Sequence, residues 1–221
     1  MAHNVAALLR LMLVTDDRLV HGRDIVELAL AAERGGVTCV QLRLKQASAR
    51  DLVALVRTLL QALTVPVLVN DRPDVAIAAG AAGVHLGPDD VPVELVRRMG
   101  PPDFLIGASV GNESEALRAG KADYWGVGPW RKTHTKGDAG AGLGPQGFRR
   151  IVLLASGKPC LAIGGIQPED VLAVLKAGGK GVAVASGILS NMDVEEAARR
   201  YRASSSSAQA QLPPPNLPNC P

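Results

Sequence analysis

The sequence predicts a single (β/α)8 barrel, in which parallel strands alternate with helices around a closed sheet. Short apolar runs alternate with helical patterns from residue 11 to residue 201 and form eight strand–helix units. A chain of 221 residues has the length that one such barrel commonly takes, so no second domain is required. Hydrophobic residues make up 47% of the chain but aromatic residues only 3%, so Ala, Val, Leu and Ile must fill the core. That composition suits strands buried on both faces.

The expected strands are short apolar runs, and amphipathic segments separate them. The strands cover Leu11–Thr15, Cys39–Leu44, Pro66–Asp71, Gly83–Leu86, Phe104–Val110, Tyr124–Gly128, Pro159–Gly164 and Gly181–Ala185. The helices cover Asp24–Arg34, Ala49–Leu63, Asp74–Ala81, Pro92–Met99, Glu113–Ala119, Pro145–Ala155, Pro168–Lys176 and Val194–Tyr201. In the second helix one helical face is apolar, which predicts that this face packs on the sheet; it consists of Leu52, Leu55, Val56, Leu59 and Leu60. Glycines before several strands, such as Gly80, are expected to end helices.

The barrel is expected to occupy residues 1–203, because the composition changes after them. Residues 204–221 read SSSSAQAQLPPPNLPNCP and show no charge and no hydrophobic periodicity. Such a segment cannot bury enough apolar surface to offset the entropy of ordering it. We therefore predict a disordered tail from residue 204 onwards.

Composition also limits the kinds of molecule that the protein is expected to bind. The chain has 24 Lys and Arg and 21 Asp and Glu, a net charge of +3 without any basic block, so a nucleic-acid surface is not expected. A local cationic pocket for a phosphorylated small molecule remains open. No run reaches the ~18 apolar residues of a membrane span, and the start of the chain lacks a signal-peptide pattern. We expect a cytoplasmic protein without membrane contact, and the sequence is compatible with a homo-oligomer.

The three cysteines do not indicate a metal site. Cys39, Cys160 and Cys220 are far apart and match no zinc spacing. Cys39 and Cys160 lie in apolar runs, where cysteine behaves as a small hydrophobe.

In a barrel of this kind the chemistry lies at the C-terminal ends of the strands. The second strand reads CVQLRLK, and its alternation places Gln41, Arg43 and Lys45 on the inner side, rising towards the mouth. One interpretation is an internal ion pair, or cations whose ends reach solvent. The other is a binding site for an anionic substrate such as a phosphate or pyrophosphate.

Carboxylates follow the third and fourth strands. Asn70 and Asp71 end the third strand, and Asp89 and Asp90 follow the fourth. Asp71 and Asp90 should lie close together, where they could form salt bridges with the basic side chains or hold Mg²⁺ together with phosphate oxygens. Asp89 is expected to cap the helix near Pro92. His85 shares a strand face with two glycines, which suits either a hydrogen-bonded core histidine or a catalytic one.

Further polar groups follow strands five to eight. Ser109 stands at the end of the fifth strand, and the long segment after the sixth carries Thr133, Thr135 and Lys136. A segment of this length in a compact barrel is typical of a functional loop. The seventh and eighth strands end in AIGGI and VAVASGI, where glycine N–H groups and Ser186 resemble a phosphate cradle.

Together these motifs resemble the thiamine-phosphate synthases. The matching runs span about residues 11–190 in family order, and NDR, GVHLG and THTK are the most specific of them. The resemblance implies that Mg²⁺ binds Asp71 and Asp90, and that Arg43, Lys45 and Lys136 are catalytic. It implies two sets of substrate ligands: Gln41, Arg43, Lys45, Asn70, Ser109 and Lys136 for hydroxymethylpyrimidine diphosphate, and Thr133, Thr135, Gly165, Ala185 and Ser186 for thiazole phosphate.

The implied reaction replaces pyrophosphate on the pyrimidine methylene by the thiazole nitrogen, giving thiamine phosphate. The chain departs from the family pattern at Leu44, which is usually acidic, and at Trp130-Arg131-Lys132. One alternative is a thiazole tautomerase, which would need a histidine where this chain has Pro129. The other is a non-catalytic protein that senses thiamine phosphates. The retained Asp71 and Asp90 favour the synthase over the tautomerase.

Overall fold

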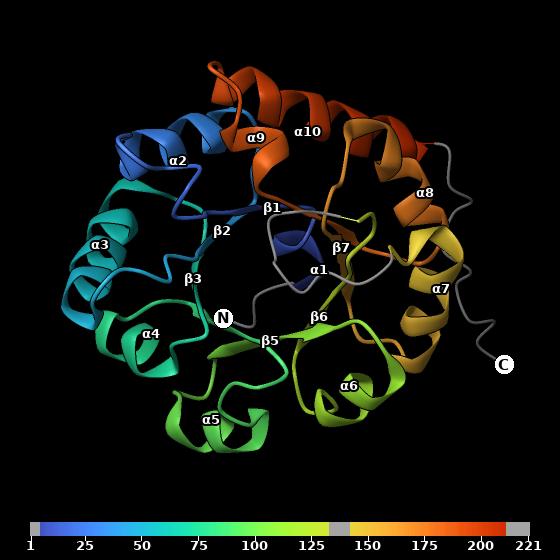
Figure 1. Cartoon of the computed structure of the whole chain (residues 1–221), viewed down its shortest axis with the longest axis horizontal. Helices are drawn as coiled ribbons and strands as arrows, with labels where there is room; N and C mark the ends of the chain where they lie inside the picture. The colour runs from blue at the N-terminus through green and yellow to red at the C-terminus, as the bar shows by residue number, and fades with distance from the viewer. Residues whose placement is uncertain (1–4, 133–141, 211–221) are drawn as a thin grey trace, which may run out of the picture.

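The protein is a closed barrel of parallel strands with helices on its outside. The computed structural model describes residues 5–132 and 142–210. Within these residues the strands follow one another around the barrel in chain order, and β8 pairs with β1 to close it. Figure 1 shows the helices as a ring around the strands. The predicted (β/α)8 barrel is therefore confirmed.

The predicted elements are present, with ends that move by at most two residues except at the last helix and at α8, whose predicted first three residues form a 3-10 turn. The strands are β1 (Leu11–Val14), β2 (Cys39–Leu42), β3 (Val67–Asn70), β4 (Gly83–Leu86), β5 (Leu105–Val110), β6 (Tyr124–Val127), β7 (Cys160–Ile163) and β8 (Gly181–Val184). The helices are α1 (Val5–Leu8), α2 (Ile25–Arg34), α3 (Ala49–Ala62), α4 (Pro73–Ala79), α5 (Val93–Met99), α6 (Glu113–Arg118), α7 (Gly144–Leu154), α8 (Val171–Lys176), α9 (Ser186–Leu189) and α10 (Val194–Ala210), with a 3-10 turn, η1 (Pro168–Asp170), before α8.

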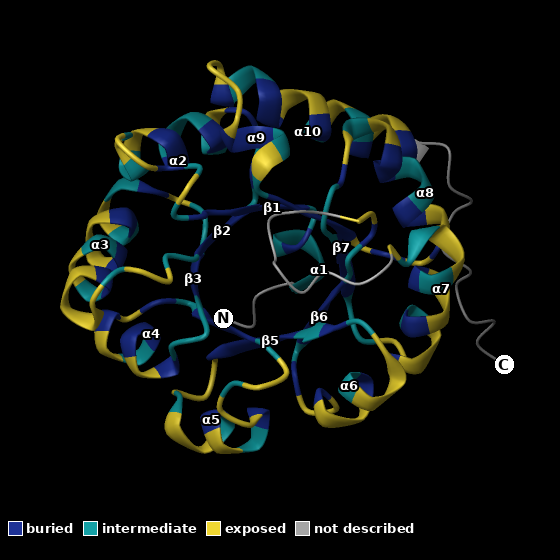
Figure 2. Cartoon of the chain, viewed as in Figure 1, coloured by how far each residue is buried: buried dark blue, intermediate teal, exposed yellow. Residues whose placement is uncertain are grey.

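The strands separate two apolar cores. Their outward side chains pack under the helices, and their inward side chains, such as Met12, Leu105 and Tyr124, fill the N-terminal half of the barrel. Leu9 and the short helix α1 close that end of the barrel (Figure 1). Figure 2 shows the strands as buried and the outer helix faces as exposed. The C-terminal half of the barrel is left for polar side chains.

Local chemistry sets where helices begin and end. Asp24 caps α2 by accepting from the backbone N–H groups of Val26 and Glu27. Pro73 begins α4, and Gly80 ends it with a φ of 78°, a left-handed conformation that favours glycine. Only residues 71–72 separate β3 from α4, and this short connection fixes the position of Asp71 at the strand end.

The prediction of disorder from residue 204 is wrong for residues 204–210, because α10 continues to Ala210. Ala198, Tyr201, Ser205 and Ala208 recur at helical spacing, and all four are buried. Within 204–210 the small residues Ser205 and Ala208 therefore continue the buried face of the helix, although the segment lacks large hydrophobic side chains. Residues 211–221, the rest of the predicted tail, lie outside the described residues.

Two other expectations can be compared with the structure. Cys39 and Cys160 are buried free thiols, as expected for small hydrophobic side chains, and burial raises the pKa of each to about 12. In the described ranges, no helix combines the length and the apolar character needed to cross a membrane.

Candidate active site

A cavity of about 810 Å³ opens at the C-terminal ends of the strands, and all eight strands contribute to its lining. Every predicted site residue that the structure describes lines this cavity. These residues are Gln41, Arg43, Lys45, Asn70, Asp71, Asp90, Ser109, Gly165, Ala185 and Ser186. Thr133, Thr135 and Lys136 lie outside the described residues.

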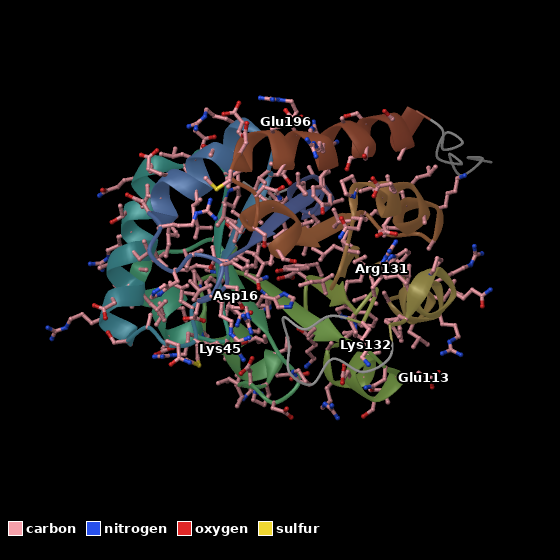
Figure 3. All side chains as sticks on the ribbon, turned by 45° about the horizontal axis from the view of Figure 1, so that its top comes forward. Asp16, Lys45, Glu113, Arg131, Lys132 and Glu196 are labelled. Carbon is pink, nitrogen blue, oxygen red and sulfur yellow. The ribbon has the colours of Figure 1, made fainter. Side chains whose placement is uncertain are left out.

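One side of the cavity, at β1 to β4, carries ionisable side chains, and we call Asp16, Arg43, Lys45, Asp71 and Asp90 the charged wall. Figure 3 shows Asp16 and Lys45 on one side of the strand ends, with Arg131 and Lys132 across from them. The charged wall has three carboxyl groups and two cationic groups.

Arg43 is the most enclosed cation of the charged wall. Its Nη1 donates to Oδ2 of Asp16 at 2.6 Å, and the two side chains are only 13% and 11% exposed. Thr15 fixes the backbone of Arg43, because its Oγ1 accepts from the Arg43 N–H at 2.8 Å. The internal ion pair considered for this strand is thus present. The pair also holds the guanidinium in the cavity, where it can meet an anion.

Asp16 is a site residue that the sequence analysis missed. It follows β1, whose end lies beside that of β2, so the ion pair joins residues that are distant in the chain. The DD pair directly after the first apolar strand is the signal that could have revealed it.

Lys45 lies nearer to solvent, and its Nζ is 3.8 Å from Oδ2 of Asp71. The segment that carries it is held by Asp17, whose carboxylate accepts from the N–H groups of Lys45 and Gln46. An ion pair this exposed contributes little to stability, so the ammonium group can exchange Asp71 for a ligand at low cost.

Asp71 and Asp90 face each other, as predicted. Burial raises the pKa of Asp71 to about 6, and a hydrogen bond with Asp90 and the charge of Asp90 act in the same direction. Asp71 also adopts a left-handed backbone with a φ of 64°, held by its N–H donating to the His85 carbonyl. Such a conformation is uncommon for a residue other than glycine and concentrates at functional sites.

This carboxyl pair fits a divalent cation. The described residues contain no cluster of three or more His, Cys, Asp or Glu arranged as a complete metal site. Mg²⁺ is usually held by one or two carboxylates, with phosphate oxygens and water completing its coordination. A cation here would relieve the repulsion that raises the pKa of Asp71.

The expected role of Asp89 was wrong. The N-cap of α5 is Pro92, which makes no side-chain cap, and the Asp89 side chain is exposed. Asp90 is the residue that shapes this turn, because its Oδ2 accepts from the N–H of Gly87 at 2.6 Å.

The opposite side of the cavity, after β7 and β8, is made mainly of backbone. We call Gly164, Gly165, Ala185, Ser186 and Gly187 the glycine wall, and none of them is ionisable. Gly164 and Gly165 have φ values of 96° and 66°, and a Cβ on Gly164 would lie 2.8 Å from that of Pro129. Glycine is therefore required for the chain to turn there.

Trp130 and Arg131, two of the residues that depart from the family pattern, lie at the start of the strand-six loop and contact neighbouring elements. Trp130 is buried and meets Phe148 edge to face at 5.6 Å. Arg131 pairs with Asp170, and its N–H donates to the Gly164 carbonyl. These contacts tie the start of the loop to the glycine wall.

The floor of the cavity is polar but uncharged at Gln41 and Ser109. Gln41 is 2% exposed and donates to the sulfur of Met12. His85 is buried, lines the cavity beside Ser109 and is hydrogen-bonded on both ring nitrogens, as expected for a hydrogen-bonded core histidine.

The fold and the site define a class of protein: a (β/α)8 barrel whose cavity, at the C-terminal ends of the strands, has a charged wall on one side and a glycine wall on the other. The family model "Thiamine monophosphate synthase" matches residues 11–188. A thiamine-phosphate synthase of Azorhizobium caulinodans is 45% identical over 202 residues, covering 88% of this chain and 93% of that protein. One of Chloroflexus aurantiacus is 47% identical over 199 residues, covering 88% and 91%.

A solved structure agrees with these sequence matches. Thiamine phosphate pyrophosphorylase from Pyrococcus furiosus superposes with a TM-score of 0.84 at 37% identity, covering 93% of this chain and 99% of that one. The chain therefore belongs to the thiamine monophosphate synthase family.

Proposed function

We propose that this protein is a thiamine-phosphate synthase, which joins hydroxymethylpyrimidine diphosphate to a thiazole phosphate. One observation carries the proposal: the residues that the family resemblance assigns to both substrates, as far as the structure describes them, line one cavity. The cavity has one region of mixed charge, which includes two cations, and one backbone-made region, which suits two phosphorylated substrates.

The reaction is a substitution at the pyrimidine methylene carbon. The bond from this carbon to the diphosphate oxygen breaks, and its electron pair leaves with pyrophosphate. The lone pair of the thiazole nitrogen then forms the new bond to carbon. The nucleophile is neutral and carries no proton to remove, so the enzyme needs no general base, and it must align two substrates and stabilise the leaving group.

We assign the leaving group to the charged wall. Arg43 and Lys45 lie where they can donate to pyrophosphate oxygens as negative charge grows on them, and Lys136 is proposed to join them from the strand-six loop. Asn70 and Ser109 are proposed to bind the same substrate, with Gln41 on the floor. In this arrangement the strongest contacts form during bond breaking, which is what accelerates the reaction.

Asp71 and Asp90 are proposed to hold Mg²⁺. When bound, the ion would neutralise charge on the pyrophosphate oxygens. Without it, the charged wall has more carboxyl groups than cationic groups, a poor match for a diphosphate. The raised pKa of Asp71 supports the proposal: burial is its main cause, and the charge of Asp90, which a cation would offset, adds to it.

The thiazole phosphate is assigned to the glycine wall. Gly165, Ala185 and Ser186 offer N–H groups and a hydroxyl, and Thr133 and Thr135 are proposed to complete the site. This phosphate keeps its charge throughout the reaction, so polar groups without ionisable partners suffice to bind it.

The direct test is to incubate the purified protein with both substrates and Mg²⁺ and to measure thiamine phosphate and pyrophosphate. We expect equal amounts of the two products, and none when either substrate is omitted. Binding of both substrates without any product would instead indicate a sensor.

We further propose that the enzyme acts in the cytoplasm on these two small molecules. The buried free thiols of Cys39 and Cys160 support a reducing compartment. Fractionation of the source cells, with the protein detected by antibody, tests the location.

A further inference from the structure

A buried chain of hydrogen bonds runs under the cavity floor. Tyr124 Oη lies 3.0 Å from Nδ1 of His85, and Nε2 of His85 lies 3.0 Å from Oγ of Ser109. Tyr124 is 1% exposed and His85 6% exposed, Ser109 is partly exposed, and both His85 and Ser109 line the cavity. The chain therefore connects the apolar interior of the barrel to the binding site.

Two glycines make room for this arrangement. A Cβ on Gly107 would lie 2.1 Å from Cζ of Tyr124 and 2.5 Å from Nδ1 of His85. A Cβ on Gly126 would lie 2.9 Å from Cε1 of His85. Gly107 stands opposite both His85 and Tyr124 in the strand register, so the two rings meet across a position without a side chain. The sequence thus holds space open for the rings at two adjacent strands.

The chemistry of the buried phenol sets the direction of the hydrogen bonds. Burial raises the pKa of the Tyr124 hydroxyl well above its ordinary value, so the hydroxyl keeps its proton and must donate it. His85 Nδ1 is then the acceptor, which places the ring proton on Nε2. Nε2–H donates to Ser109 Oγ, and the serine proton is left to point into the cavity. With the opposite direction, Ser109 would offer a lone pair to the substrate and repel an anion.

We propose that Tyr124 and His85 are positioning residues that hold the Ser109 hydroxyl as a donor towards an acceptor atom of the pyrimidine diphosphate. The inference rests on the proposed function. The acceptor is a phosphate oxygen or a nitrogen of the pyrimidine ring, since both present lone pairs.

A double-mutant cycle tests whether Tyr124 acts through Ser109. Affinity for pyrimidine diphosphate is measured by titration calorimetry with Mg²⁺ for the wild type, Tyr124→Phe, Ser109→Ala and the double variant. We expect Tyr124→Phe to weaken binding about fivefold, the effect of one hydrogen bond. In the Ser109→Ala background the same change should have no effect, because the hydroxyl that it orients is gone. Equal weakening in both backgrounds would overturn the proposal.

Kinetics and a second pair of variants separate positioning from packing. Tyr124→Phe should raise the KM for the pyrimidine substrate and leave the thiazole KM unchanged, with the melting temperature close to that of the wild type. His85→Gln keeps one donor and one acceptor and should retain most of the affinity, whereas His85→Leu should lose it. Equal loss in both His85 variants, with melting temperatures unchanged, would contradict the proposal.

Two partial ligands identify the acceptor. Inorganic pyrophosphate with Mg²⁺ carries only phosphate oxygens, and hydroxymethylpyrimidine carries only the ring. Weaker binding of either one to Tyr124→Phe supports the proposal, and unchanged binding of both overturns it. Failure of the wild type to bind pyrimidine diphosphate at all would instead reject the function on which the inference rests.

Discussion

The two sides of the cavity use different chemistry to meet anions. The charged wall consists of side chains that neutralise one another: Arg43 pairs with Asp16, and Lys45 lies beside Asp71. The glycine wall has no ionisable residue, and its shape depends on the positive φ values of Gly164 and Gly165. The side chains of the charged wall can exchange their ion-pair partners for a ligand, whereas the glycine wall is a fixed surface.

This difference matches what each half of the reaction needs. A leaving diphosphate gains charge as its bond breaks, so cations and a metal ion near it stabilise the transition state more than the ground state. The thiazole phosphate keeps its charge and needs only to be bound in place. We therefore expect substitutions in the charged wall to affect kcat, and substitutions in the glycine wall to affect the KM for the thiazole.

The largest effect is expected from the carboxyl pair. Asp71→Asn or Asp90→Asn should lower kcat by about two to three orders of magnitude, because each removes a proposed ligand of Mg²⁺. Steady-state rates over a Mg²⁺ titration measure the loss, and circular dichroism checks the fold. Asp103→Asn is the matched control, since it removes an exposed carboxylate that does not line the cavity and should retain activity. Full wild-type activity in excess chelator would exclude the metal role.

Arg43→Ala should be the next most damaging change. Loss of one charge-assisted contact to the leaving group costs about 3 kcal/mol, or roughly a hundredfold in kcat. Arg72→Ala is the control, because Arg72 pairs with Asp74 on the surface and lies away from the cavity lining. If Arg43→Ala changed only the thiazole KM, Arg43 would bind the thiazole phosphate rather than the pyrimidine diphosphate.

The raised pKa of Asp71 predicts an effect on stability without metal. In the folded protein the pKa is about 6 against an ordinary 3.8, so the folded state binds the proton more tightly than the unfolded state. The free energy of unfolding should therefore fall as pH rises from about 4 to about 6 and stay lower above that range. After allowance for solvent screening, Asp71→Asn should stabilise the metal-free protein by about 1 kcal/mol at pH 7.5.

Chemical denaturation at pH 3.5 and pH 7.5 in chelator measures this difference. The gain in stability should be present at pH 7.5 and absent at pH 3.5. A gain of the same size at both pH values would show that the ionisation of Asp71 is not its cause.

The smallest effect is expected behind the glycine wall. Tyr201 of α10 donates from Oη to the Ile166 carbonyl at 2.8 Å and so supports the turn after β7. Tyr201→Phe removes this bond, and we expect the thiazole KM to rise by a few-fold, about 0.5–1 kcal/mol, with kcat unchanged. Steady-state kinetics with each substrate varied in turn measure it. A lower kcat with an unchanged thiazole KM would show that α10 supports the charged wall rather than the glycine wall.

Much of the fold and of the site could be predicted from the sequence, because both depend on local patterns. Apolar runs define the strands, and polar residues at strand ends, such as Asn70 and Asp71, fall at the mouth of any such barrel. The DD pair after the first strand marks Asp16 as a candidate, but its pairing with Arg43 depends on the heights at which neighbouring strands end, which no local pattern gives. The contact between His85 and Tyr124 depends on the space above Gly107, which no local pattern reveals. The last turns of α10 were missed because small residues form their buried stripe.

The central claim is that the charged wall serves the leaving group and the glycine wall serves the thiazole phosphate. A matched pair of variants tests it most directly, with kcat and both KM values measured for each. Lys45→Ala should lower kcat about a hundredfold and leave the thiazole KM unchanged. Ser186→Ala should raise the thiazole KM about fivefold and leave kcat unchanged. If Lys45→Ala changed only the thiazole KM, or Ser186→Ala changed only kcat, the assignment of the two walls would be wrong.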